Sequence, residues 1–204
     1  MLEAMPMRLS RALVRTGAVV LLALVFLAAP GRAGSSADVP EPAGIWNGPM
    51  RGPTPKTLKG AVVLDIAALE AVLASKPLLV DVAPGDKKPA DFPKDLPWLP
   101  IHRSIPGALW LPGAGGAALA PAREAMLYQR VAELTNGDKS KPIVTFCHPE
   151  CWGSWNTAKR LVLAGYTQVN WFPDGIEGWQ NTHDTAAVKP DPAWESTAPA
   201  EPQP

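Results

Sequence analysis

Both cysteines of the chain, Cys147 and Cys151, lie in one short stretch four residues apart. The apolar residues 142–146 predict a buried strand that ends at Cys147, and Ser154 is a suitable cap for a following helix. Free backbone N–H groups and the positive end of the helix dipole stabilise a thiolate in such a place. We therefore interpret Cys147 as a candidate nucleophile.

The role of Cys151 has more than one interpretation. It can act as a resolving thiol that attacks a persulfide or a mixed disulfide on Cys147. Alternatively, the two cysteines form a permanent disulfide, although so short a loop gives little entropic stabilisation, which favours the reactive role. A third alternative is that the two thiols, with His148, bind Cu(I). We favour His148 as an exposed loop residue, and we therefore expect no metal site.

The residues around the two thiols would shape this site. Glu150 would disfavour a thiolate nearby and would repel an anionic sulfur donor such as thiosulfate. Trp152 and Trp155, which flank the loop, would shield the site from water or belong to the core. The candidate loop residues are His148, Pro149, Glu150, Trp152, Gly153 and Ser154.

Composition narrows the function classes. The 204 residues carry a formal net charge of zero, so no basic surface indicates a nucleic-acid partner.

At the N-terminus, three arginines precede an apolar run over residues 18–29, which is shorter than the roughly 20 residues that span a bilayer. We expect residues 1–33 to be a secretory signal peptide, leaving no membrane span after cleavage. Export implies a periplasmic, oxidising location; an uncleaved anchor is the alternative.

Strand and helix patterns alternate along the middle of the chain. Residues 34–60 read as a linker or extended arm, 61–184 as one domain, and 185–204 as a Pro-rich disordered tail. The alternation predicts an α/β fold with a mostly parallel central sheet flanked by helices. Strands are expected at 61–64, 78–82, 108–111, 143–146 and 169–172, and helices at 66–74, 121–134 and 154–164.

Several segments, in this order, resemble the rhodanese-like domain family. The segments are the strand of residues 78–82, the Arg103-Ser104-Ile105-Pro106-Gly107-Ala108 element, the cysteine loop from Cys147 to Ala158, and the closing segment 174–179. The resemblance covers residues 61–184. It implies a rhodanese-like fold without a cofactor, and sulfur transfer through a persulfide on Cys147. Asp81, at the end of a predicted strand, would orient the cysteine loop or cap the next segment, and Arg103 would pair with Asp81 or with another carboxylate nearby.

A closer resemblance is to a secreted subgroup called PQQ-dependent catabolism-associated CXXCW motif proteins. The shared residues are 96–100, 103–111, Cys151-Trp152 and 154–160. The subgroup is linked by gene neighbourhood with quinoprotein alcohol oxidation, which implies a periplasmic quinoprotein dehydrogenase system as a partner. The chain departs from many active rhodaneses at Ala83, where they carry Arg, and in a cysteine loop without Arg or Lys, which argues against thiosulfate turnover.

The leading hypothesis assigns the catalytic roles to Cys147, Cys151, Asp81 and Arg103. The reaction would be sulfur transfer or thiol–disulfide exchange with a small sulfur donor or a thiol or disulfide partner. The alternatives are a non-catalytic accessory protein of a quinoprotein system and a Cu(I)-binding dithiol protein.

Overall fold

The computed structural model describes residues 38–195. The predicted signal peptide over residues 1–33 and the last residues of the tail, 196–204, lie outside this range. Among the described residues no helix has the length and the apolar character needed to cross a membrane. The strands are β1 (Ala61–Val63), β2 (Leu78–Asp81), β3 (His102–Ser104), β4 (Leu109–Trp110), β5 (Ile143–Phe146), β6 (Val169–Phe172) and β7 (Ala186–Val188). The helices are α1 (Ile66–Leu73), α2 (Pro121–Thr135), α3 (Trp152–Leu163), α4 (Gly175–Gln180) and α5 (Pro192–Glu195).

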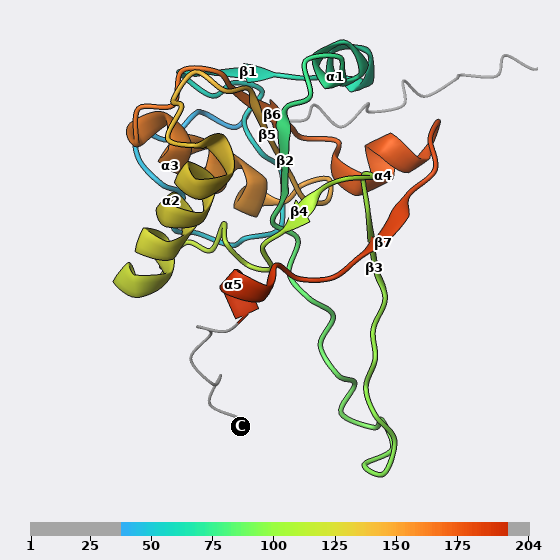
Figure 1. The fold of residues 1–204 in the computed structure, drawn as a ribbon. Helices are drawn as coiled ribbons and strands as arrows, with labels where there is room; N and C mark the ends of the chain where they lie inside the picture. The colour runs from blue at the N-terminus through green and yellow to red at the C-terminus, as the bar shows by residue number, and fades with distance from the viewer. Residues whose placement is uncertain (1–37, 196–204) are drawn as a thin grey trace, which may run out of the picture. The chain divides into compact units, whose positions relative to one another are not determined.

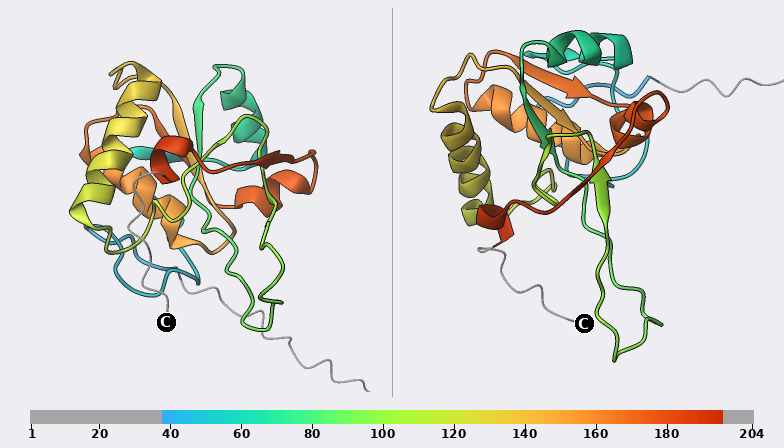
Figure 2. Two further views of the ribbon diagram at one scale, coloured as in Figure 1. Left: turned by 60° about the horizontal axis from the view of Figure 1, so that its bottom comes forward. Right: turned by 45° about the vertical axis from the view of Figure 1, so that its right-hand side comes forward.

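Five strands form a parallel sheet in the order β1-β6-β5-β2-β4 (Figure 1). Strand β5, which leads to the first cysteine, lies at its centre between β2 and β6, and all four of its residues are buried. Helices α2 and α3 lie on one side of the sheet, and α1 and α4 lie on the other (Figure 2). The predicted α/β fold with a parallel sheet flanked by helices is therefore confirmed.

Local chemistry explains where the helices begin and end. Asp65 caps α1 by accepting a hydrogen bond of 2.8 Å from the backbone N–H of Ala68. Pro121 occupies the first turn of α2, and Asn136 ends that helix in the left-handed region with φ of 54°. Helix α3 begins two residues before the predicted position, with Cys151 rather than Ser154 as its N-cap residue.

Ser154 is instead a buried residue within the first turn of α3. Its hydroxyl donates to the carbonyl of Cys151 over 3.3 Å and accepts a hydrogen bond of 3.0 Å from the indole N–H of Trp171. The serine therefore links the start of α3 to strand β6. A serine before an apolar helix has the same sequence signature whether it caps the helix or bonds to the core, which explains the shift in the predicted start.

The segment before the domain, over residues 38–60, packs against α3. Trp46 stacks on Trp152 with ring centroids 4.2 Å apart, and its backbone N–H and carbonyl both bond to the side chain of Asn156. Leu58 is buried in the core, and the carbonyl of Thr57 accepts a hydrogen bond from the indole of Trp155. The described part of the expected arm is therefore held against the domain by specific contacts.

Part of the expected disordered tail is also ordered in the structure. Strand β7 pairs antiparallel with β3 to form a second, two-stranded sheet. Trp194 in α5 is buried, with the guanidinium of Arg123 3.5 Å from its ring centroid. The Pro- and Ala-rich composition gave no packing pattern, and the isolated tryptophan is the residue that anchors the segment.

A long connection over residues 82–101 joins β2 to β3 and extends away from the sheet (Figure 1). It contains no helix or strand, as its prolines predict. Leu96, Leu99 and Ile101 are exposed on it, with 51%, 77% and 72% of their surface accessible. We call residues 84–101 the projecting loop.

Glu41 anchors the 38–60 segment and gives a pH-dependent prediction. Its carboxylate accepts hydrogen bonds from the backbone N–H of Lys59 (2.7 Å) and the hydroxyl of Thr57 (2.8 Å), and lies 3.4 Å from Nζ of Lys159. Burial opposes ionisation, but these partners outweigh it and hold the pKa of Glu41 below its ordinary value of 4.5. The stabilisation is therefore present above the unfolded-state pKa and is lost as pH falls through the folded-state pKa.

We expect Glu41→Gln to lower the free energy of unfolding by about 1–2 kcal/mol at pH 7, measured by urea denaturation. The difference from the unchanged protein should shrink as the pH falls through the lowered folded-state pKa of Glu41, below which both chains carry a neutral side chain at this position. Glu70→Gln, at a half-exposed ion pair with His183, serves as the control and should change stability by less than about 0.5 kcal/mol. A Glu41→Gln effect that is equal at all pH values would contradict this account.

Candidate functional site: a disulfide between the central strand and helix α3

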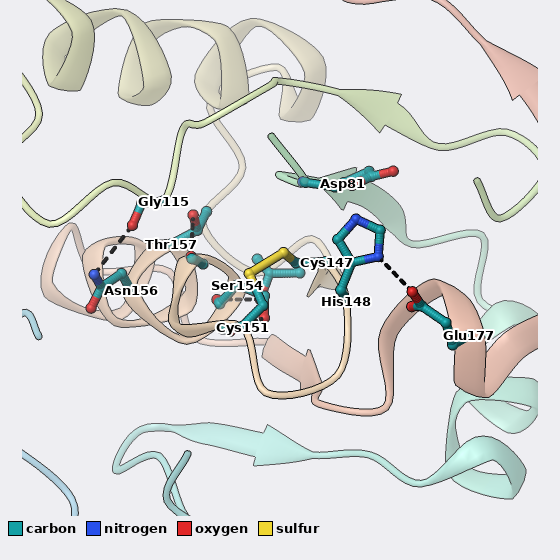
Figure 3. The surroundings of a disulfide bond; sticks show 12 residues. Asp81, Gly115, Cys147, His148, Cys151, Ser154, Asn156, Thr157 and Glu177 are labelled. Atoms are coloured by element: carbon teal, nitrogen blue, oxygen red, sulfur yellow. Dashed lines mark hydrogen bonds and ion pairs between the residues drawn. A yellow bond between two sulfur atoms is a disulfide. The ribbon is translucent and has the colours of Figure 1, made fainter. Parts of the chain in front are cut away.

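The two cysteines form a disulfide at the carboxyl edge of the parallel sheet (Figure 3). Cys147 directly follows β5, and Cys151 is the N-cap residue of α3. Their Cα atoms are 6.3 Å apart, within the range a disulfide requires. The carboxyl ends of parallel strands are the edge at which α/β sheets bind ligands. The sequence prediction that Cys147 ends a strand and that both cysteines meet in one loop agrees with this geometry.

The two sulfur-bearing residues differ in their surroundings. Cys147 is fully buried, and its carbonyl accepts a hydrogen bond of 2.9 Å from the N–H of Ile176 at the start of α4. A Cβ atom added to Gly175 would lie 2.4 Å from that carbonyl oxygen, so α4 packs directly against the backbone of Cys147. Cys151 retains 6% of its surface. Both cysteines are therefore buried, and of the two only Cys151 lines the pocket described below.

The 38–60 segment fixes the cysteine loop from outside. Arg51 and Cys151 form an isolated antiparallel β-bridge, in which the N–H of Trp152 donates to the carbonyl of Met50 over 3.1 Å. The N–H of Gly52 donates to the carbonyl of Glu150 over 2.9 Å. These bonds hold Glu150 in the left-handed region, with φ of 53°, which lets a loop of three residues return to the helix start.

His148 is directed away from the sulfur atoms. Its Nδ1 lies 2.8 Å from Oε1 of Glu177 in α4, as the dashed line in Figure 3 marks. The other oxygen of that carboxylate is buried and has no hydrogen-bond partner among residues 38–195. This contact ties the loop to α4. Within residues 38–195 no group of three or more His, Cys, Asp or Glu side chains is placed to hold a metal ion.

Asp81 is fully buried at the end of β2 and stabilises the neighbouring backbone. Its carboxylate accepts hydrogen bonds from the N–H of Ala83 (2.8 Å) and the hydroxyl of Ser104 (2.6 Å), and its Oδ2 lies 2.7 Å from Nε2 of His102. Of the two roles considered for Asp81, these partners match the capping of the next segment. Asp81 therefore holds the backbone at the edge of the site in place and is not assigned a role in the reaction.

His102, which the sequence analysis did not single out, is the partner of Asp81. Arg103 instead donates from Nε to the hydroxyl of Thr185 over 2.8 Å and also bonds to the Thr185 carbonyl. The expected pairing of Arg103 with Asp81 is thus not what the structure shows. The reason is the two-residue period of a strand: residues 102 and 104 face Asp81, and 103 faces away. Recognising 102–104 as a strand, with two polar residues on one face, would have identified His102.

A pocket of about 230 Å³ opens beside the disulfide at Cys151. Met50 and Arg51 line it from the 38–60 segment, and Val82 and Pro84 line it from the end of β2. Cys151 and the glycines at 113, 115, 116 and 153 complete its wall. The wall of the pocket is therefore almost wholly apolar, and Cys151 brings the disulfide to it.

Comparison with known proteins supports the family suggested by this geometry. The sequence matches the rhodanese-like domain over residues 66–182, which is more than half of the chain. The chain belongs to the rhodanese-like domain family. No curated protein matches the chain.

Two solved structures illustrate the structural neighbours. A thiosulfate sulfurtransferase from Pseudomonas aeruginosa is 19% identical with a TM-score of 0.41, and the match covers 64% of this chain and 21% of that one. A protein from Saccharomyces cerevisiae described as uncharacterized is 16% identical with a TM-score of 0.34, and the match covers 59% of this chain and 91% of that one. The matched part of this chain thus spans about a fifth of the length of the sulfurtransferase.

The adjacent residues His102 and Arg103 provide a matched pair of substitutions. His102→Ala removes a partner of the fully buried Asp81 and the stack on Trp110, whose ring centroid lies 3.9 Å away. It should lower the free energy of unfolding by about 2–4 kcal/mol, because a buried charge loses a partner. Arg103→Ala, which removes only exposed hydrogen bonds to Thr185, should cost less than about 1 kcal/mol. Chemical denaturation of the two variants measures both values, and equal costs would contradict the assigned pairing.

Proposed function

We propose that the protein catalyses sulfur transfer or thiol–disulfide exchange at the Cys147–Cys151 pair. The observation that carries the proposal is the disulfide itself, which joins the residue after β5 to the N-cap residue of α3. This is the loop that holds the reactive cysteine in the family to which the chain belongs. Here the loop holds two thiols instead of one, and one borders a pocket.

The second thiol changes the chemistry available to the loop. In the reduced protein, one thiolate attacks the sulfane sulfur of a persulfide or polysulfide donor, and the donor thiolate leaves. The product is a cysteine persulfide. The second thiolate then attacks the cysteine-bound sulfur, sulfide leaves, and the protein becomes the disulfide. Two electrons pass from the thiol pair to the transferred sulfur, and the pair is regenerated when an external dithiol reduces the disulfide.

The residues of the loop favour a dithiol cycle over simple thiosulfate turnover. Residues 148–150 contain no Arg or Lys to bind a thiosulfate dianion, and Glu150 is exposed in the loop. The position where many rhodaneses carry Arg is Ala83, whose N–H is used by Asp81. A donor whose reactive sulfur needs no cationic cluster, such as a persulfide, fits this loop better.

Incubation of the reduced protein with polysulfide, followed by mass spectrometry, tests the proposal. Cys147→Ser and Cys151→Ser each retain one thiol, and at least one of them should gain about 32 Da as a persulfide. The unchanged protein should release sulfide and return to the disulfide form. The variant with both cysteines changed to serine is the control and should show neither effect. Absence of both the mass gain and the sulfide release would overturn the proposal.

The cellular setting is part of the proposal. The N-terminal residues 1–33 have the pattern of a secretory signal, which supports a periplasmic location. The Cys151-Trp152 pair and residues 154–160 are the features shared with the CXXCW subgroup, and they support an association with a PQQ-dependent oxidation system. An oxidising compartment is also where a cysteine pair cycles through a disulfide.

A second candidate function is a non-catalytic accessory role. The observation in its favour is the projecting loop, because Leu96, Leu99 and Ile101 are exposed together on a segment that extends beyond the sheet. Exposed apolar side chains in one segment are typical of a protein contact surface. The polysulfide experiment separates the two functions: an accessory protein with a structural disulfide would form no persulfide and release no sulfide.

A further inference from the structure

We infer that the pocket beside the disulfide binds the carbon chain of an external thiol, and that it selects thiols whose chain is short, uncharged and apolar. The inference rests on the proposed function, because the bound thiol is the one that reduces the Cys147–Cys151 disulfide. It specifies the class of external thiol, which the proposed function leaves open.

The chemistry of the pocket wall indicates an apolar ligand. Met50, Val82, Pro84 and four glycines form most of the wall. Arg51 also borders the pocket, but it is an exposed residue, and the β-bridge to Cys151 places its backbone there. A charged chain would give up water for a wall that offers few polar atoms. An apolar chain, in contrast, is stabilised by leaving water.

The volume of the pocket sets the size of the chain. An apolar cavity of about 150 Å³ is large enough to hold benzene, and this pocket has a volume of about 230 Å³. It is smaller than the roughly 300–1,000 Å³ of pockets that bind drug-sized ligands. The space therefore fits a chain or a ring of about six carbons or fewer, together with the thiol sulfur.

Gly153 keeps the space beside the sulfur open, although the fold does not require a glycine there. It lies in the first turn of α3, where alanine favours the helix more, and its φ is not positive. A Cβ atom built on it would lie 3.4 Å from Sγ of Cys151, 3.8 Å from Cγ2 of Val82 and 3.9 Å from Cα of Gly115, which are ordinary contact distances. A methyl group would therefore fit, and a ligand that uses this space explains why none is present.

The neighbouring glycines, unlike Gly153, are required by the backbone. A Cβ atom on Gly115 would overlap the carbonyl oxygen of Gly153, so the two backbones are in contact. Asn156 strengthens this contact by donating to the carbonyl of Gly115 over 3.2 Å. Gly113 turns the chain with φ of 73°, which other residues rarely adopt. The wall formed by these residues is therefore rigid, and it holds the pocket at a fixed size.

The bound thiol reacts with Cys151, because of the two cysteines only this one lines the pocket. Its thiolate forms a bond to Sγ of Cys151 as the Cys147–Cys151 bond breaks, and the electron pair of that bond leaves on Cys147. A second thiol of the same kind then attacks the external sulfur of the mixed disulfide and releases the thiolate of Cys151. Two external thiols are oxidised to one disulfide, the protein disulfide is reduced to two thiols, and the two protons pass to these thiols or to solvent.

The test compares 1-propanethiol with 2-mercaptoethanol, which carries a hydroxyl group in place of the terminal methyl group. Alkylation and mass spectrometry follow the reduction of the oxidised protein. Each rate is divided by the rate at which the same thiol reduces the protein unfolded in urea, so that the intrinsic reactivities of the two thiols cancel. We expect the normalised rate for 1-propanethiol to be about threefold higher or more, because burial of one methylene or methyl group is worth about that factor.

Two substitutions in the pocket wall should change this preference. Met50→Gln introduces a polar group at nearly unchanged side-chain length and retains the backbone carbonyl that bonds to Trp152. It should lower the ratio of the 1-propanethiol rate to the 2-mercaptoethanol rate by about threefold or more. Gly153→Ala fills part of the space, and it should remove the advantage that 1-butanethiol has over ethanethiol in the unchanged protein.

Met126→Gln is the matched control, because Met126 is also partly buried against the core but does not line this pocket. It should leave the ratio within about 1.5-fold of the unchanged protein, since a distant site acts independently. A Met50→Gln ratio equal to that of Met126→Gln, or no preference for 1-propanethiol in the unchanged protein, would overturn the inference and leave the proposed function intact. A disulfide that neither thiol reduces would contradict the proposed function itself.

Discussion

The structure depends on the burial of helix α3, in which ten consecutive residues are buried. A helix against one face of a sheet ordinarily buries one side and exposes the other. Because Ser154, Asn156, Thr157, Lys159 and Arg160 are all buried, each requires a polar partner. Ser154 contacts Trp171 of β6, and Thr157 donates to the Gly153 carbonyl of its own helix. The partners of Asn156, Lys159 and Arg160 come from residues 38–60, from residues 113–117 and from Glu124 of α2.

This requirement for partners assembles the site. Asn156 holds Trp46 and the carbonyl of Gly115, and Lys159 lies 3.4 Å from Glu41. On the other side, Arg160 pairs with Glu124 and donates to the carbonyl of Gly116. The two segments therefore meet at the N-terminus of α3, where they form the walls of the pocket beside Cys151. The segments that contact the polar residues of α3 therefore also line the pocket at its N-terminus.

The sequence was sufficient to predict the elements whose signals are local. The apolar runs at β2, β5 and β6, the cap of α1 and the ends of α2 all follow from residue types within a few positions. The position of Cys147 after the central strand followed from the same patterns. Tertiary partners decide the features that the sequence did not predict: Cys151 as the N-cap of α3, and His102 instead of Arg103 beside Asp81. The position of Trp194, isolated in a Pro-rich segment, is set by contacts with residues distant in the sequence.

The reduction potential of the Cys147–Cys151 disulfide tests the central claim that this pair is a reaction centre. Cys151 lies at the N-terminus of α3, where the positive end of the helix dipole stabilises its thiolate and therefore the reduced form. Equilibration with glutathione or dithiothreitol buffers, followed by alkylation and mass spectrometry, gives the fraction that is reduced. The account predicts a potential between about −270 and −120 mV, the range of thiol–disulfide oxidoreductases. A potential below about −300 mV, typical of structural disulfides, would contradict it.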